Sequence, residues 1–224
     1  LLTVSEHSKR DLMCYGIGET AEIGVVPNGP GPSVSAVPEM NILARLGLPE
    51  HTSYCLAQAS TEPHKNTALL FRAFGHECGD QIKLVLFGKA GRTDFLRAGI
   101  AVPDSVVFAG AVTDEELAAL YRNALAVCIP SIAEGFGLPA LEAMTLGSPV
   151  LHGPCGALPE VVGCSGIELD IEQPGEWSEA LLRLLENADL RSGLSQAGRD
   201  RAARYSWEAA GKALLGHLDR WFDP

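Results

Sequence analysis

The sequence lacks any long apolar segment. No run of hydrophobic residues approaches the ~18 residues that a membrane-spanning helix requires, although 46% of its 224 residues are hydrophobic. The first residues also show no signal-peptide pattern. Because Leu1 stands in the middle of a pattern, we expect the natural protein to begin earlier.

The sequence is also poor in positive charge. It has 17 Lys and Arg against 28 Asp and Glu, a formal net charge of −11. A general nucleic-acid-binding protein carries a basic face, so we expect no nucleic-acid partner. An anionic ligand held in a local pocket remains compatible with this charge. The hydrophobic content argues for a globular chain and against disorder.

Cysteine pairs with metal-binding spacing are missing as well. The six cysteines are scattered, and none forms a C-x-x-C pair. We therefore expect no metal site. Cys55 and Cys128 fall in strand-like apolar runs and are predicted to be buried as small hydrophobic residues. Reduced structural thiols are typical of cytoplasmic proteins, so a cytoplasmic location is expected.

The chain does contain a well-marked strand, loop and helix. The apolar run 125–129 predicts a strand that is buried on both faces. Residues 138–146 predict a helix with Pro139 in its first turn, where proline is tolerated. Gly135 and Gly137 lie between the two elements. The free N–H groups and positive dipole end of a helix that begins there would bind an anion.

Two glutamates bracket this turn. Helical spacing extended backward from Glu142 places Glu134 and Leu138 on the same face. A carboxylate on a covered face needs a partner or a ligand hydroxyl. The alternative is a pair of solvated helix glutamates, which the glycine- and proline-containing setting disfavours.

The run Glu134 to Val150, EGFGLPALEAMTLGSPV, resembles the signature of the retaining glycosyltransferases of family 4, which have the GT-B fold. The resemblance covers nearly the whole chain but only the C-terminal half of such an enzyme. It implies that residues 1–224 form the donor-binding domain and that the N-terminal acceptor domain is absent. The helix expected over 206–224 would cross toward that missing domain. The missing domain would be a partner of this chain, and peripheral membrane association would occur through that domain.

The resemblance also implies roles for individual residues. Glu134 would contact the sugar hydroxyls, Glu142 the ribose hydroxyls, and Lys65, in the motif EPHKN, the diphosphate. Glu134 and Lys65 would be the catalytic pair. The remaining donor-binding positions that the resemblance implies are Gly29, Gly88, Ala111, Val112, Gly135, Phe136, Gly137 and Leu138.

The chain departs from the family pattern beside Lys65. Many members carry an arginine five residues before this lysine or immediately before it. Ser60 and His64 stand there instead. Either His64 is the second cation, or phosphate binding is weaker, or the enzyme is altered. His64 could equally be an ordinary surface histidine.

Apolar runs alternate with helical patterns at short spacing along the chain. This alternation predicts an α/β fold with a doubly wound, Rossmann-like parallel sheet and ligands beyond the carboxyl ends of its strands. Capping-box patterns predict helices over 3–13 and 114–124. A further helix is predicted over 38–46. Pro159 predicts another helix start, where Glu160 would complement the helix dipole.

The resemblance implies transfer of a hexose from a nucleotide diphosphate sugar with retention, and without metal or cofactor. The EPHKN and EGFGLP motifs look most like the mannosyltransferase-like branch, which favours GDP-mannose. This chain alone is expected to be inactive. The alternatives are a non-catalytic nucleotide-sugar-binding or assembly module of the same fold, and a nucleotide-sugar epimerase or phosphorylase. The cofactor-lysine signature of a phosphorylase and the clustered aspartates of a flavodoxin-like signalling domain are not found.

Overall fold

A six-stranded sheet forms the centre of the computed structural model, which describes residues 1–18, 22–39, 41–75 and 77–222. The strands are β1 (Leu2–Thr3), β2 (Gly24–Val25), β3 (Tyr54–Gln58), β4 (Lys83–Phe87), β5 (Val106–Gly110), β6 (Ala126–Ile129), β7 (Val150–His152) and β8 (Ile167–Glu168). The α-helices are α1 (Glu6–Cys14), α2 (Ile42–Arg45), α3 (Thr67–Ala73), α4 (Glu77–Gln81), α5 (Arg92–Arg97), α6 (Asp114–Asn123), α7 (Leu138–Leu146), α8 (Leu158–Val162), α9 (Pro174–Glu186), α10 (Ala188–Ala202) and α11 (Trp207–Phe222). Short 3₁₀ turns are η1 (Pro32–Ser35), η2 (Pro63–Lys65) and η3 (Gly163–Ser165). Among these helices, none combines the length and hydrophobicity that crossing a bilayer demands.

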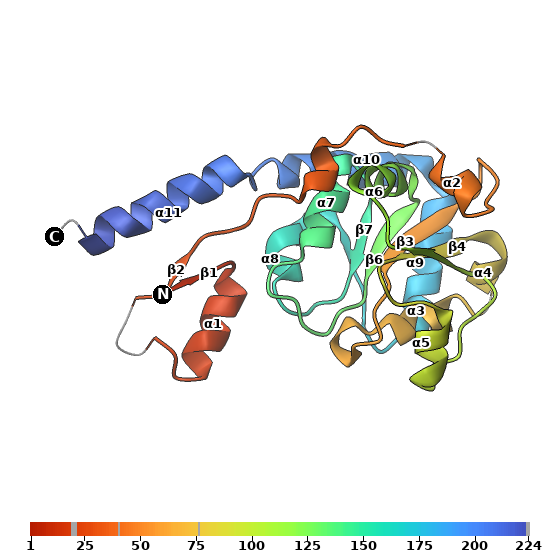
Figure 1. Ribbon diagram of the computed structural model, residues 1–224, viewed down its shortest axis with the longest axis horizontal. Helices are drawn as coiled ribbons and strands as arrows, with labels where there is room; N and C mark the ends of the chain where they lie inside the picture. Colours follow the sequence, from red (N-terminus) through yellow and green to blue (C-terminus); the bar gives the residue numbers. More distant parts are fainter. Residues whose placement is uncertain (19–21, 40, 76, 223–224) are drawn as a thin grey trace.

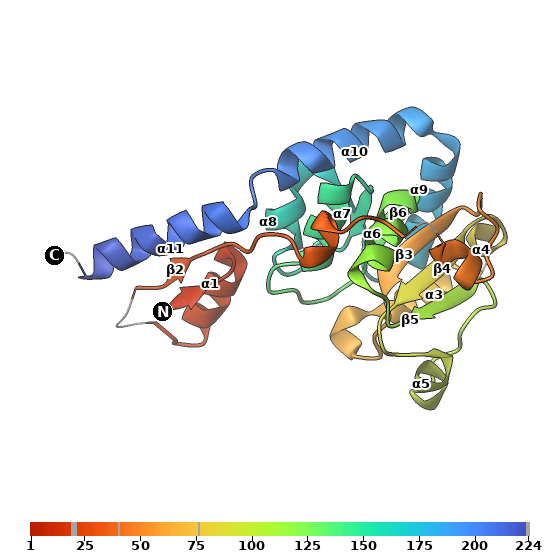
Figure 2. The same ribbon diagram turned by 45° about the horizontal axis from the view of Figure 1, so that its top comes forward.

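The strands of the large sheet run in the order β5-β4-β3-β6-β7-β8, and every neighbouring pair is parallel. Counted from β3, this is the order of doubly wound nucleotide-binding sheets, in which the winding reverses between the first and fourth strands. Helices cover both faces of the sheet (Figures 1 and 2). The predicted α/β doubly wound parallel sheet is therefore confirmed.

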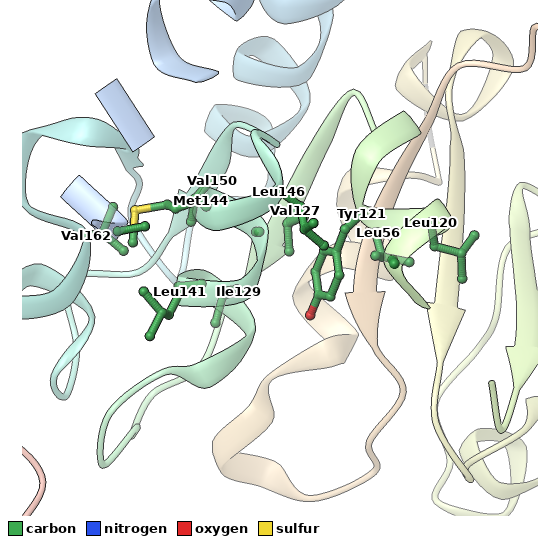
Figure 3. Close-up of a cluster of buried hydrophobic side chains, with 14 of the residues drawn as sticks. Leu56, Leu120, Tyr121, Val127, Ile129, Leu141, Met144, Leu146, Val150 and Val162 are labelled. Atoms are coloured by element: carbon green, nitrogen blue, oxygen red, sulfur yellow. The ribbon is translucent and has the colours of Figure 1, made fainter. Parts of the chain in front are cut away.

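Both faces of this sheet are buried. Leu56 of β3 and Val127 of β6 belong to a cluster covered by α2, α6, α7 and α8 (Figure 3). Cys55 and Cys128 belong to the cluster on the other face, covered by α3, α4, α5 and α9. Because consecutive strand residues point to opposite faces, burial on both sides requires a continuous apolar run. The predicted burial of the two cysteines is confirmed, and burial raises the pKa of the Cys55 thiol.

A smaller unit lies beside the main body, at one end of the molecule (Figure 1). It consists of β1, α1 and β2, and we call it the βαβ unit; β1 and β2 pair in parallel. Helix α11 leaves the main body and runs along this unit, where the Trp221 indole donates to the Glu22 carboxylate at 2.9 Å. The final helix was predicted over 206–224, of which residues 223–224 lie outside the described part.

The first helix begins later than predicted. The sequence pattern placed a capping box at Thr3, but Thr3 pairs with Val25 in the small sheet. The Ser5 hydroxyl instead accepts the N–H of Ser8 and caps α1. Strand pairing outweighs the local signal here because it also satisfies backbone groups of the preceding residues. By contrast, the second predicted capping box, at Thr113, is confirmed.

The helix predicted over 38–46 is also shorter than expected. The structure has only α2 from Ile42 to Arg45, and residue 40 lies outside the described residues. The helix α7 matches its predicted bounds of Leu138 and Leu146.

Candidate nucleotide-sugar site

The two residues predicted to be catalytic meet where the winding of the sheet reverses. Lys65 ends η2, which follows β3, and Glu134 lies in the loop after β6. Strands β3 and β6 are neighbours, so their following loops face one crevice. The Lys65 ammonium lies 2.7 Å from the Glu134 carboxylate, and both side chains are largely buried. Topology thus brings together two charges that are 69 residues apart in the chain.

Neighbouring polar groups hold this pair in place. Asn66 has a left-handed backbone (φ 50°) that ends η2 directly after Lys65. Its side-chain amide donates to the carbonyls of Pro130, at 3.2 Å, and Ile171, at 3.1 Å, which ties the lysine turn to the end of β6. The Ser131 hydroxyl donates to the Glu134 carboxylate at 2.8 Å.

A glycine outside the predicted site also determines where the backbone of Glu134 can lie. Gly156 has φ 64°, and a Cβ there would lie 2.5 Å from both the backbone nitrogen and oxygen of Glu134. Only a residue without a side chain permits this approach. Gly156 could not be recognised from the sequence, because glycines in loops are common.

The loop before α7 presents unpaired amide groups. Gly137 caps the helix with φ 95°, and a Cβ at that position would lie 2.8 Å from Leu158 Cδ2. No described residue accepts a hydrogen bond from the amides of Gly135, Phe136, Gly137 or Leu138. Free N–H groups at the positive end of a helix dipole form a site for an anion.

Glu142 lies one turn into α7 and is enclosed by η1 and by Gly31, which precedes it. The Ser33 hydroxyl donates to its carboxylate at 3.2 Å. A side chain at Gly31 would collide with the same carboxylate. Burial raises the pKa of Glu142, and the hydrogen bond from Ser33 offsets this only in part. Within the described residues Glu142 has no cationic partner, so it can accept ligand hydroxyl groups.

Tyr121 of α6 forms part of the wall beside Glu142. Its ring packs edge-on against Phe87, with the centroids 6.1 Å apart, and Figure 3 shows its hydroxyl oxygen in red. Burial, together with the nearby Glu142 carboxylate, raises the pKa of Tyr121. The hydroxyl therefore stays protonated, and none of the described residues accepts its hydrogen bond. Tyr121 was not predicted as a site residue, because an aromatic residue in a helical pattern usually belongs to the hydrophobic core.

One open cleft joins these groups. Its volume is about 430 Å³, within the ~300–1,000 Å³ usual for ligand sites. The predicted residues Lys65, Glu134, Phe136, Gly137, Leu138 and Glu142 line it. The residues that the sequence did not single out are Asn28, Gln58, Phe87, Leu117, Tyr121 and Pro139.

Other predicted residues lie away from this lining. Gly29 is buried against α11, where a Cβ would lie 2.6 Å from the backbone nitrogen of Trp207. Gly88, with φ 125°, donates its N–H to Gly110 at the end of β5. Ala111 is exposed, and Val112 packs against the core cluster. Gly135 is exposed and its carbonyl accepts from Ser5 at 2.7 Å.

The residues at the two expected arginine positions do not place a second cation beside Lys65. The His64 ring lies 3.4 Å from the exposed Glu62 carboxylate, and the His64 side chain is itself 46% exposed. The Ser60 hydroxyl accepts the N–H of Glu62. A role for His64 in binding therefore stays a prediction.

No group of three metal-binding side chains gathers anywhere in residues 1–18, 22–39, 41–75 and 77–222. The polar groups of the cleft include one ammonium, two carboxylates, the side-chain amides of Asn28 and Gln58, and a row of backbone amides. This set suits a ligand that combines an anion with several hydroxyl groups.

Comparison with known proteins identifies the family. Residues 40–201 match the model of the "Glycosyl transferases group 1" family, and the chain belongs to this family. Its fold is that of GT-B glycosyltransferases of known structure. The sucrose-phosphate synthase of Thermosynechococcus elongatus superposes with a TM-score of 0.79 at 25% identity, covering 98% of this chain and 57% of the other. Anabaena HepE, solved with UDP and glucose, gives a TM-score of 0.78 at 19% identity, covering 98% and 62%.

Two curated relatives are similar in sequence. The chain is 34% identical over 187 residues to a D-inositol 3-phosphate glycosyltransferase of Salinispora arenicola, covering 76% of this chain and 42% of that protein. It is 34% identical over 218 residues to an MMP alpha-(1->4)-mannosyltransferase of Mycolicibacterium hassiacum, covering 93% and 51%. The chain thus spans about half the length of the curated relatives it matches.

Proposed function

We propose that this chain is the donor-binding half of a retaining glycosyltransferase, which transfers a hexose from a nucleotide diphosphate sugar to an acceptor without a metal or cofactor. The observation that carries the proposal is the Lys65–Glu134 pair at the reversal point of the sheet, beside the free amides before α7. In the proposed role the protein acts in the cytoplasm.

The proposed mechanism assigns the diphosphate to Lys65 and the amides of Gly137 and Leu138. A lysine ammonium has three donors, so Lys65 can keep its bond to Glu134 while it binds a phosphate oxygen. These fixed positive groups stabilise the charge that develops on the leaving diphosphate. The other oxygen of Glu134 accepts sugar hydroxyls, and Glu142 accepts those of the ribose.

The N-terminal GT-B domain is the proposed partner. Several large apolar side chains of the βαβ unit and α11 are exposed: Leu1, Leu2, Met13, Tyr15, Ile17, Leu215 and Phe222. A second domain that packs on them would remove this apolar surface from water. That domain would carry the acceptor site and any peripheral membrane contact.

The donor is proposed to be GDP-mannose. The sequence motifs resemble the mannosyltransferase-like branch, and one relative is named as a mannosyltransferase. UDP-glucose is the competing donor, since HepE was solved with it.

Calorimetric titration with GDP, UDP and ADP, in the presence of a chelator, tests the proposal. We expect one nucleotide to bind saturably and to identify the base. Failure of all three to bind, both to this chain and to the full-length protein, would contradict a donor-binding role.

The first prediction concerns Glu142. Glu142→Ala should weaken nucleotide-sugar binding by about 1–3 kcal/mol, because charge-assisted hydrogen bonds to the ribose are lost. Since burial raises the pKa of Glu142, wild-type affinity should also fall with decreasing pH, beginning at a higher pH than for a free glutamate. Calorimetry measures both effects. Glu186→Ala, an exposed change on α9, is the control, and equal affinity in the two variants would refute the assignment.

The second prediction concerns the chain as a whole. It should bind a donor but transfer no sugar, because half of the proposed cleft is absent. Turnover is measured with radiolabelled GDP-mannose and UDP-glucose, with the full-length protein in parallel. Transfer by this chain alone would contradict the division of the site between two domains.

A non-catalytic nucleotide-sugar-binding module is the second candidate. The lack of an arginine at positions 60 and 64 favours it. Sugar-nucleotide binding without turnover in the full-length protein would establish this alternative.

A further inference from the structure

Glu160 binds the N-terminus of a helix that is distant in the sequence. Both oxygens of its carboxylate accept backbone N–H groups of α1, from Glu6 and from His7, at 3.0 Å each. The sequence pattern assigned Glu160 to the dipole of its own helix, α8. The carboxylate in fact satisfies two first-turn donors of α1 that have no acceptor within that helix.

The same turn of α1 also holds the glycine loop of the cleft. The hydroxyls of Ser5 and Ser8 lie 2.7 and 3.1 Å from the Gly135 carbonyl oxygen and donate to it. Ser5 is fully buried. The first turn of α1 therefore bridges Glu160 on one side and Gly135 on the other.

This bridge fixes the orientation of one peptide of the anion site. The carbonyl of Gly135 and the N–H of Phe136 belong to the same planar peptide and point in opposite directions. Because glycine adopts many backbone conformations, this peptide would otherwise rotate readily. With the carbonyl held by two serines, the Phe136 N–H is held pointing away from α1.

We propose that Glu160 is a positioning residue of the donor site. It holds the first turn of α1, and through Ser5 and Ser8 this turn locks the Gly135–Phe136 peptide in its ligand-binding orientation. Movement of the βαβ unit away from the sheet would release that peptide. The inference rests on the proposed function, since the locked peptide directly precedes the Gly137 and Leu138 amides of the proposed diphosphate site.

Amide hydrogen exchange on the whole chain tests this coupling directly. Glu160→Ala should speed exchange at residues 6–7 and also at Ala140, Leu141 and Ala157, whose N–H groups donate to the carbonyls of Gly137 and Glu134 at the two ends of the glycine loop. Glu160→Gln, which keeps an acceptor oxygen but not the charge, should give a smaller change. The double variant Ser5→Ala/Ser8→Ala should speed exchange at residues 140, 141 and 157. Faster exchange at 6–7 alone in Glu160→Ala would overturn the proposal, because Glu160 would then only cap α1.

Nucleotide titration supplies the second measurement. Glu160→Ala should weaken binding of GDP or UDP about fivefold, the scale of a charge at a helix end, while Glu186→Ala leaves it unchanged. Combining Glu160→Ala with the double serine change should cause little further loss, because all three residues act through one peptide. Unchanged affinity in Glu160→Ala would overturn the proposal. If wild-type protein binds no nucleotide, the proposed function fails, and the exchange measurement still decides whether Glu160 controls the loop.

Discussion

Lys65→Ala is expected to reduce the affinity for the nucleotide diphosphate by about a hundredfold or more, and to abolish sugar transfer by the full-length protein. The lysine supplies the proposed cation for the diphosphate, and a hydrogen bond to a charged group contributes about 1.5–3 kcal/mol. Its loss also leaves the largely buried Glu134 carboxylate with Ser131 as its remaining side-chain partner. An unpaired carboxylate repels the phosphate that should bind beside it.

Calorimetry with the preferred nucleotide measures this loss. Lys212→Ala is the matched control, because it removes the same charge from an exposed pair on α11. Lys65→Arg should restore only part of the affinity, since a planar guanidinium does not occupy the position of a compact ammonium. Wild-type affinity in Lys65→Ala, with an unchanged unfolding temperature, would exclude the proposed diphosphate role.

Gly156→Ala is expected to cost both stability and donor binding. Alanine at φ 64° is strained, and its Cβ would press on the backbone of Glu134. Strain and overpacking each cost about 1–3 kcal/mol. Because the Glu134 backbone must shift to relieve the contact, the 2.7 Å pair with Lys65 should be lost. Nucleotide affinity should therefore fall at least about tenfold.

Gly99→Ala separates the effect of backbone strain from the effect of a Cβ that presses on Glu134. Gly99 has a similar φ of 73°, but a Cβ there would meet nothing within 4 Å. This variant should therefore lose only the stability that backbone strain costs, and nucleotide binding should not change. Denaturant unfolding and calorimetry on both variants make the comparison. If the two variants prove equal in stability and affinity, Gly156 does not position Glu134.

The strand, the glycine loop and α7 could be predicted because their signals are local. A continuous apolar run specifies a strand buried on both faces, and the proline and glycines mark where α7 begins. The bounds Leu138 and Leu146 were correct for this reason. The predicted start of the first helix was wrong, because the capping pattern at Thr3 competed with strand pairing between Thr3 and Val25, which is distant in the sequence.

The sequence by itself determined the alternation of strands and helices, the glycine turn before α7 and the identity of the charged residues around that turn, because each of these follows from patterns within a few residues. Only the tertiary structure decided which of these groups meet. The parallel order of β3 and β6 brings Lys65 to Glu134, η1 encloses Glu142, and the Glu160 carboxylate caps α1. These contacts join segments tens of residues apart, so they follow from strand order and chain crossing and not from any local pattern.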